Sequence, residues 1–355
     1  MNKHIYNIIG VMSGTSLDGV DLSYVQFSLS GGNWKYRIIT AETIPYSDKW
    51  VTRLKEAVDY TTQQLQQLNN EYTVLLSDII RSFIAKHKIS GIDALSSHGH
   101  TILHQPQKGI TLQIGNLPQI ATLTGQKVVC DFRVQDVAMG GQGAPLVPIG
   151  DALLFADYTY CLNLGGFANI SFEEHGKRLA YDICAVNTVL NFYSGRLGYP
   201  YDNGGKIARG GKLNNDLLFE LESLEFYNKP YPKSLGVEFV KATVLPLLEQ
   251  YNIPTEDKLH TYVAHVASQI AQCVATPNCS LLITGGGVYN TFLIEKIQAL
   301  LPGVAVVLPN DDTIQYKEAL IFALLGVLKL RGEINVLASV TGAQKNHSSG
   351  KIYST

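Results

Sequence analysis

The stretch at residues 8–21 constrains the fold of this chain more than any other, because it joins two apolar runs through a tight polar turn. It reads Ile-Ile-Gly-Val-Met-Ser-Gly-Thr-Ser-Leu-Asp-Gly-Val-Asp. Apolar residues enter it, small hydroxyl residues and glycines form its middle, and a second β-forming run begins at Val20. This order predicts a strand, a polar turn and a second strand.

The turn has the chemistry of a phosphate-binding hairpin. Its glycines let the backbone approach an anion closely, and its N–H groups and hydroxyls can donate to that anion. Asp18 and Asp21 would repel a bare phosphate, but they can reach a Mg²⁺ ion that accompanies one. We expect Asp18 to contact this ion through a water molecule. An ordinary Gly/Ser hairpin is the alternative. The candidate ATP- and phosphate-binding residues here are Ser13, Gly14, Thr15, Ser16, Leu17, Asp18, Gly19, Val20 and Asp21.

Two further glycine turns follow along the chain. Residues 163–171, Asn-Leu-Gly-Gly-Phe-Ala-Asn-Ile-Ser, repeat the strand–turn–strand pattern around Gly165 and Gly166. An apolar run at 280–283 leads into Gly285, Gly286 and Gly287, which would let the backbone lie against a planar or anionic ligand. The P-loop pattern Gly-x-x-x-x-Gly-Lys-Ser/Thr is absent, so these turns indicate a different kind of nucleotide site.

Length and composition limit the remaining possibilities. A chain of 355 residues is long enough for two domains, and its net charge of −2 gives no basic field for nucleic acid. Five cysteines without a Cys-x-x-Cys pair favour reduced thiols in the cytoplasm over a disulfide framework or a zinc site. The sequence enters its first strand at once and has no apolar run of about 18 residues, so we expect neither a signal peptide nor a membrane span.

A buried strand is predicted at residues 92–95, with a polar loop directly after it. The loop holds His98, His100 and His104. Because no carboxylate or thiolate accompanies these histidines, we expect them to contact backbone or substrate rather than a metal.

The glycine turns and several other motifs resemble one family. The first hairpin is similar to the phosphate hairpin of the sugar kinase/Hsp70/actin superfamily, and more narrowly to the opening motif of the anhydro-N-acetylmuramic acid kinases. Residues 131–148 and the Val-Thr-Gly-Ala at 340–343 also match that family. The resemblance runs in order along essentially the whole chain.

The resemblance implies an α/β fold with two ribonuclease-H-like lobes and ATP in the interdomain cleft. The first lobe would comprise residues 1–128 and 315–355, and the second lobe residues 129–314. The two hairpins would clamp the β- and γ-phosphates, the triple glycine would contact adenosine, and Mg²⁺ would neutralise the phosphates. A homodimer is also implied.

The catalytic residue implied by the resemblance is Asp182, which we place at a strand end before a helical stretch. A helix N-cap is the alternative role for this aspartate. The family motif Asp-x-Gly-Pro-Gly-Asn keeps its aspartate and its Asn187 here, but Cys184, Ala185 and Val186 replace Gly-Pro-Gly. Valine does not easily adopt the backbone angles of such a turn, so the edge of the pocket is expected to be reshaped.

The sugar would be bound by residues from several segments. The alternative role for Arg133 is an ion pair with Asp131 or Asp136, and the alternative role for Glu318 is a favourable charge at the start of a helix. This sequence also has His100 where the family usually has glutamine. The candidate sugar-binding residues are His98, Arg133, Asn187 and Glu318.

The reaction implied by the family is an ATP-dependent opening and phosphorylation of 1,6-anhydro-N-acetylmuramic acid, giving N-acetylmuramate 6-phosphate in cell-wall (peptidoglycan) recycling. Two alternatives stay open. The protein could be a kinase for a different amino sugar or anhydro-sugar, or it could bind ATP without catalysis. No nucleic acid or membrane partner is expected.

Overall fold

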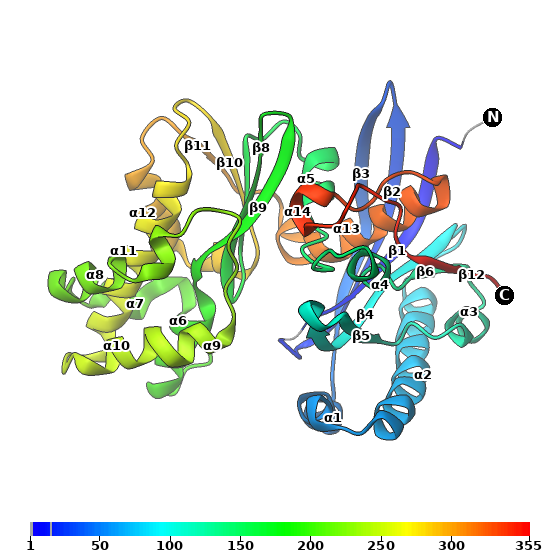
Figure 1. Ribbon diagram of the computed structural model, residues 1–355, viewed down its shortest axis with the longest axis horizontal. Helices are drawn as coiled ribbons and strands as arrows, with labels where there is room; N and C mark the ends of the chain where they lie inside the picture. The colour runs from blue at the N-terminus through cyan, green and yellow to red at the C-terminus, as the bar shows by residue number, and fades with distance from the viewer. Residues whose placement is uncertain (1–2, 15) are drawn as a thin grey trace. The chain divides into compact units, whose positions relative to one another are not determined.

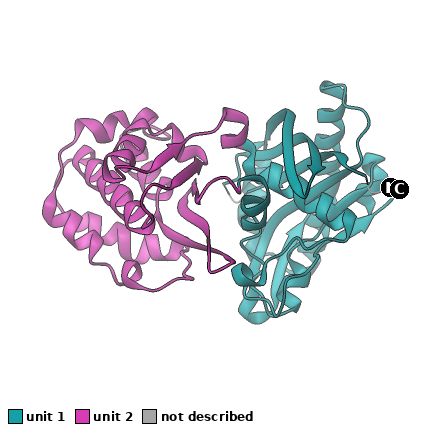
Figure 2. Ribbon diagram, turned by 90° about the horizontal axis from the view of Figure 1, so that it is seen from above, with its two compact units in different colours: residues 1–155, 316–355 teal, residues 156–315 magenta. Residues whose placement is uncertain are grey.

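The computed structural model describes residues 3–14 and 16–355. The chain divides into two compact units, residues 1–155 with 316–355 and residues 156–315, which are coloured separately in Figure 2. Each unit is built on its own mixed β-sheet with helices packed on it (Figure 1). Thr15, one of the candidate phosphate-binding residues, lies outside the described residues.

Unit 1 contains a seven-stranded sheet in which β12, β6, β4, β1, β2 and β3 are neighbours in that order and β5 pairs with β4. Strand β2 runs antiparallel to β1 and β3 runs antiparallel to β2, whereas β4 runs parallel to β1 and β6 parallel to β4. The strands are β1 (Ile5–Ser13), β2 (Gly19–Ser30), β3 (Asn33–Pro45), β4 (Ala94–Gln105), β5 (Ile110–Ile114), β6 (Val128–Cys130) and β12 (Lys351–Tyr353).

Unit 2 repeats this arrangement in a five-stranded sheet with the order β11, β10, β7, β8, β9. Here β8 and β9 continue antiparallel from β7, and β10 and β11 lie parallel on its other side. The strands are β7 (Tyr160–Leu164), β8 (Phe167–Glu174), β9 (Lys177–Ala185), β10 (Ser280–Thr284) and β11 (Ala305–Val307). The shared strand order confirms the expected α/β class with two ribonuclease-H-like units.

The helices of unit 1 bury apolar faces against its sheet. Helix α2 starts with a reciprocal capping box between Thr61 and Gln64, and its apolar residues join the core beside β1 and β4. Helix α13 packs so closely on β1 that a side chain at Gly10 would collide with the carbonyl oxygen of Ala319. The helices are α1 (Asp48–Glu56), α2 (Thr62–Lys86), α3 (Gln119–Thr124), α4 (Val134–Ala138), α5 (Pro148–Leu154), α13 (Asp311–Arg331, which begins in unit 2) and α14 (Ala338–Thr341).

In unit 2 the central helix is α11, whose buried face includes Leu259, Tyr262 and Val266 and belongs to the core of the second sheet. Short helices connect the remaining strands. The helices are α6 (Asn187–Arg196), α7 (Lys206–Gly210), α8 (Asn215–Glu222), α9 (Val237–Phe239), α10 (Leu245–Gln250), α11 (Thr255–Cys273) and α12 (Thr291–Leu300).

The boundary between the units differs from the sequence-based expectation. It falls after Phe155 rather than after residue 128. The physical reason is that β6 is paired with β4 and β12, and Phe155, which ends α5, packs its ring against Tyr36 of β3. The chain returns to unit 1 at Tyr316.

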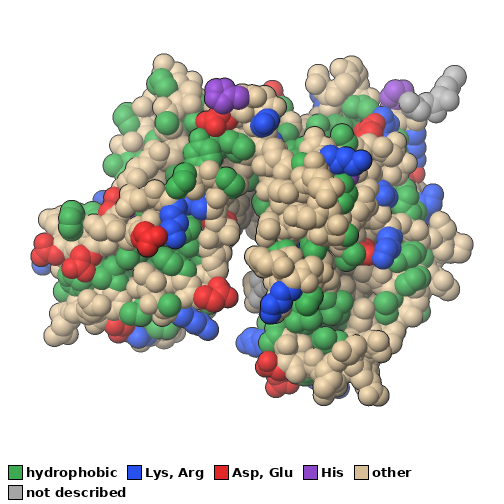
Figure 3. Space-filling view, in the orientation of Figure 1, with side chains coloured by type: hydrophobic (Ala, Val, Ile, Leu, Met, Phe, Trp, Pro, Cys, Tyr) green, Lys and Arg blue, Asp and Glu red, His purple; other side chains and the backbone are tan. Residues whose placement is uncertain are grey.

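Two surface properties bear on function. None of the helices in the described part of the chain combines the length and the apolar character that a membrane crossing requires. On the face seen in Figure 3, acidic and basic side chains are interspersed over each unit.

Candidate functional site

The first glycine turn connects β1 to β2 in unit 1, as predicted. The Leu17 N–H donates to the Gly14 carbonyl oxygen at 3.3 Å, and Leu17 has a φ of 62°, in the left-handed region. The Ser16 hydroxyl donates to Asp18 at 2.7 Å, and both side chains are exposed. Gly19 is required for a different reason, since a side chain there would collide with the Ile44 carbonyl oxygen of β3.

The remaining described residues of this turn face the protein. The Val20 side chain belongs to the core of unit 1. Ser13 is buried, and its hydroxyl lies 2.6 Å from the Tyr46 hydroxyl and 2.7 Å from His100 Nδ1. Tyr46 in turn lies 2.5 Å from the Tyr72 hydroxyl. Ser13 therefore ties the end of β1 to β4 and to two tyrosines, which the sequence motif did not predict.

Two carboxylates stand at the end of the turn: Asp18 directly precedes β2, and Asp21 lies in it. Asp21 accepts a hydrogen bond from Thr43 at 2.6 Å, and burial together with the neighbouring Asp18 charge raises the pKa of Asp21. Among the described residues no group of three or more His, Cys, Asp or Glu side chains is arranged to hold a metal. The donor set still fits Mg²⁺, because this ion is commonly held by one or two carboxylates plus substrate phosphates.

The histidines after residue 95 do not lie in a loop, so that expectation was wrong. They lie inside β4, which continues to Gln105 because β5 pairs with its second half and extends the ladder. His98 is buried, its Nδ1 lies 2.9 Å from the Gly99 carbonyl oxygen, and its Nε2 lies 2.8 Å from Arg133 Nε. Burial and the adjacent guanidinium hold the pKa of His98 well below its usual value, so the ring is neutral.

Arg133 forms neither of the ion pairs considered for it. Asp131 instead pairs with Lys351 at 2.7 Å, and Asp136 accepts hydrogen bonds from other groups. The Arg133 guanidinium donates to His98 and, at 2.7 Å, to the carbonyl oxygen of Gly143. Burial lowers the pKa of Arg133 to about 10, which leaves it charged at neutral pH.

Glu318 lies in α13 two residues after Tyr316, whose φ of −111° and ψ of 18° interrupt the helix. Glu318 therefore stands in the first turn of the helical segment that follows this kink, as the helix-start alternative expects. Its side chain reaches solvent, but the surrounding protein crowds it and raises the pKa of the carboxyl. Arg133 lowers this pKa and Asp21 raises it, so Glu318 shares one electrostatic environment in unit 1 with both residues.

In unit 2, the second glycine turn joins β7 to β8 and sits at the start of α6. The Gly165 carbonyl oxygen accepts the Asn187 N–H at 3.3 Å, and the Gly166 carbonyl oxygen accepts the N–H groups of Val186 and Thr188. The first amides of α6 thus find their acceptors in the turn. This contact places Asn187 beside the turn through its backbone.

Asp182 lies inside β9, three residues before its end, and it does not cap α6. The helix is preceded by Val186, whose side chain offers no cap. The Asp182 carboxylate accepts the Leu235 N–H at 2.9 Å, and the Asp182 N–H donates to the Lys233 carbonyl oxygen at 3.0 Å. Burial raises the pKa of Asp182, and the bond from Leu235 partly offsets this.

The segment that replaces Gly-Pro-Gly needs no glycine. Cys184 and Ala185 complete β9, and Val186 has a φ of −125°, so none of the three uses the left-handed region. All three side chains are fully buried in the core of unit 2.

The three glycines after β10 have different structural roles. Gly285 has a φ of 85°, which favours glycine, and a side chain at Gly287 would collide with Leu164 of β7. Gly286 is exposed, and a side chain there would meet no atom within 4 Å. Only Gly286 therefore presents open backbone, while its neighbours let this turn pack against the second glycine hairpin.

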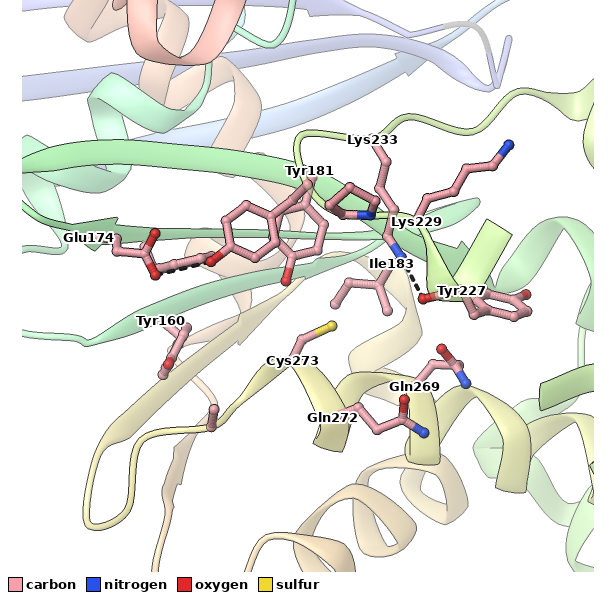
Figure 4. Close-up of a pocket in the computed structure, with 14 residues that line it drawn as sticks. Tyr160, Glu174, Tyr181, Ile183, Tyr227, Lys229, Lys233, Gln269, Gln272 and Cys273 are labelled. Atoms are coloured by element: carbon pink, nitrogen blue, oxygen red, sulfur yellow. Dashed lines mark hydrogen bonds between the residues drawn. The ribbon is translucent and has the colours of Figure 1, made fainter. Parts of the chain in front are cut away.

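A hollow of about 360 Å³ lies elsewhere in unit 2 (Figure 4). Tyr181 and Ile183 of β9, the sequence neighbours of Asp182, line it. Lys233 also lines the hollow and donates to the carbonyl oxygens of Phe226 and Tyr227 at 3.2 and 3.1 Å. Residues 233–235, which contact Asp182, are thus themselves held to residues 226–227 by the Lys233 side chain.

The sequence motifs did not predict the residues that hold the candidate side chains in place. These are His100 and Tyr46 at Ser13, Gly143 at Arg133, and Leu235 at Asp182. Two of these contacts are made by backbone atoms, which leave no signature in residue type.

Comparisons with known proteins show the family of this chain. A family model described as anhydro-N-acetylmuramic acid kinase matches residues 6–355. Curated anhydro-N-acetylmuramic acid kinases from Pasteurella multocida and Vibrio cholerae are 36% and 35% identical, over 97% of this chain in both cases and over 96% and 97% of their own lengths. Component A of (R)-2-hydroxyglutaryl-CoA dehydratase from Acidaminococcus fermentans is a solved structure with 13% identity and a TM-score of 0.46, covering 90% of this chain and 96% of that chain. The relatives and the family model together show that this chain belongs to the anhydro-N-acetylmuramic acid kinase family.

Proposed function

We propose that this protein is an ATP-dependent kinase that hydrolytically opens 1,6-anhydro-N-acetylmuramic acid and phosphorylates its O6, yielding N-acetylmuramate 6-phosphate for cell-wall sugar recycling. The observation that carries the proposal is the family match over residues 6–355. It is supported by a half-buried aspartate with a raised pKa at the position of the family's catalytic residue.

In the proposed reaction Asp182 is the general base. Its carboxylate takes a proton from a water molecule, and the water oxygen bonds to the anomeric carbon while the bond from that carbon to the bridging oxygen breaks. The freed O6 then takes the γ-phosphoryl group of ATP, and ADP leaves. A general base of this kind contributes about 10²–10⁴-fold to the rate.

The other candidate residues bind and orient the substrates. We assign the phosphates to the first hairpin of unit 1 and to Gly165 and Gly166 of unit 2, and the adenosine to the turn at Gly286. The open space at Gly286 supports that assignment. We assign the sugar to His98, Arg133, Glu318 and Asn187, of which Arg133 carries a fixed positive charge.

We further propose that Mg²⁺ accompanies ATP and is reached by Asp18 through water, with Asp21 nearby. When bound, the ion would neutralise phosphate charge during transfer. All five cysteines are free, which supports a cytoplasmic location. A homodimer is proposed from the family alone, and light scattering of the purified protein tests it.

The deciding experiment measures ADP release from Mg-ATP with and without 1,6-anhydro-N-acetylmuramic acid and follows the sugar by mass spectrometry. We expect sugar-dependent ADP release, with the sugar gaining one phosphoryl group and one water. N-acetylglucosamine serves as the control sugar. Release stimulated only by the control sugar would identify a different kinase, and ATP binding without stimulation by either sugar would contradict the proposal.

A further inference from the structure

Asp136, on α4, is a fully buried carboxylate that does not contact any candidate ligand-binding side chain directly. Its Oδ2 accepts the Gly143 N–H at 2.7 Å, and its Oδ1 accepts the Thr341 hydroxyl of α14 at 2.8 Å. The His347 Nε2 lies 3.6 Å from the same Oδ1. Asp136 therefore joins two stretches of unit 1 that are far apart in the sequence, residues 136–143 and residues 341–347.

The glycine loop at residues 140–143 is shaped around this carboxylate. A side chain at Gly141 would approach Asp136 Oδ2 to 2.2 Å, and the Gly141 N–H donates to the Asp136 carbonyl oxygen at 2.9 Å. Gly143 has a φ of 70°, in the left-handed region. The loop therefore has one arrangement that keeps both of its hydrogen bonds to Asp136.

That arrangement aims the Gly143 carbonyl oxygen at Arg133, whose Nη1 donates to it at 2.7 Å. On the other side of the guanidinium, Arg133 Nε donates to His98 Nε2. A guanidinium is a planar group with several fixed N–H donors, so two acceptors at different nitrogens set the direction of the rest. The remaining N–H donors of Arg133 therefore point in a defined direction.

We propose that Asp136 is a positioning residue, which orients Arg133 toward oxygen atoms of the sugar by holding the Gly143 carbonyl oxygen in place. This inference rests on the sugar-binding role proposed for Arg133. Asp136 acts through the backbone of Gly143 and not through an ion pair with the guanidinium. Thr341 supports Asp136 from α14, because its hydroxyl donates to the second carboxylate oxygen.

The test compares Thr341→Val with Thr341→Ser in steady-state kinetics of the whole protein. Valine has nearly the same shape as threonine but lacks the donor, so we expect the KM for the anhydro-sugar to rise about tenfold while the KM for ATP is unchanged. Serine keeps the hydroxyl and should restore the sugar KM. Thr124→Val is the matched control, because the buried Thr124 hydroxyl donates to a helix carbonyl oxygen in α3.

A double-mutant cycle separates positioning from general damage. Asp136→Asn should raise the sugar KM in the wild-type background but change it less than twofold in an Arg133→Ala background, because the residue acts through Arg133. Equal losses in both backgrounds, or a parallel rise in the KM for ATP, would overturn the proposal.

A crystal structure of the Thr341→Val protein tests the same inference without turnover. We expect the Gly143 carbonyl oxygen to move away from Arg133 Nη1. Retention of both Arg133 hydrogen bonds at their present lengths would refute the positioning role. If the wild-type protein does not act on the sugar at all, the proposed function fails, while this structural result still decides the role of Asp136.

Discussion

Burial determines the charge state of several residues beside the first hairpin. His100 is buried under Tyr46 and Tyr72, and burial lowers its pKa to about 4. The ring is therefore neutral at pH 7, and its Nδ1 shares a short hydrogen bond with Ser13. Because the unfolded histidine takes up a proton near its ordinary pKa of 6.5, protonation favours unfolding between pH 6.5 and pH 4.

The first prediction follows from this difference. Acidification from pH 7 to pH 4 should cost unit 1 roughly 3 kcal/mol at His100, and His100→Gln should remove that cost. The thermal midpoint of wild-type protein should therefore fall further on acidification than that of the variant, by roughly 5 °C or more. Differential scanning fluorimetry across this pH range measures it. A His175→Gln control, at an exposed position, should behave as wild type; if His100→Gln does so too, burial of His100 is not the cause.

The second prediction concerns Asp182. Asp182→Asn keeps the size of the side chain but cannot take a proton, so kcat should fall by about 10²–10⁴-fold. ATP affinity, measured by calorimetry, should change little because this carboxylate is assigned no phosphate contact. Asp257→Asn is the control, since Asp257 is also half-buried and accepts one backbone N–H, from Lys212. Full turnover in the Asp182→Asn protein would remove this residue from the role of base.

At the scale of elements, the sequence pattern correctly predicted the turns, which depend on the residue types within them. Both glycine hairpins and the turn after β10 occur where alternating apolar runs and glycines placed them. The length of β4 was missed because its second half is stabilised by pairing with β5, a partner that its own sequence does not encode. The interior place of Asp182 was missed likewise, since Cys184 and Ala185 extend β9 by burial and pairing rather than by a turn signal.

The third prediction tests the second hairpin. A side chain built at Gly165 would lie 3.3 Å from Asn163 Nδ2 and 3.6 Å from the Phe167 carbonyl oxygen, so the fold accommodates a larger residue there with little adjustment. Gly165→Val should therefore fold but bind ATP at least tenfold more weakly, because its methyl groups would occupy the space assigned to phosphate. Gly210→Val, at an open position in the same unit, is the control. Nucleotide titration monitored by calorimetry decides it, and unchanged affinity in folded Gly165→Val protein would contradict the hairpin's assignment.

At the scale of the whole molecule, the chain passes between the units twice, at residues 155–156 and 315–316. Both passages are anchored in unit 1 by one buried ion pair. Asp151, on α5, lies 2.7 Å from Lys317, on α13, and the two side chains are 5% and 4% exposed. The Lys317 ammonium also lies 5.3 Å from the centre of the Phe155 ring. This pair holds the ends of two sequence-distant segments together within unit 1.

The last prediction is that removing one charge of this pair destabilises the protein more than removing both. Lys317→Met leaves the Asp151 carboxylate buried without its partner ammonium, which typically costs about 3–5 kcal/mol. Asp151→Asn combined with Lys317→Met removes both charges, so the thermal midpoint should recover part of the loss. Lys258→Met is the control, because the Glu249 partner of that buried lysine is 42% exposed and stays hydrated. A double variant that is less stable than Lys317→Met would show that the two charges do not depend on each other, and the ion pair could then not be what anchors the two passages.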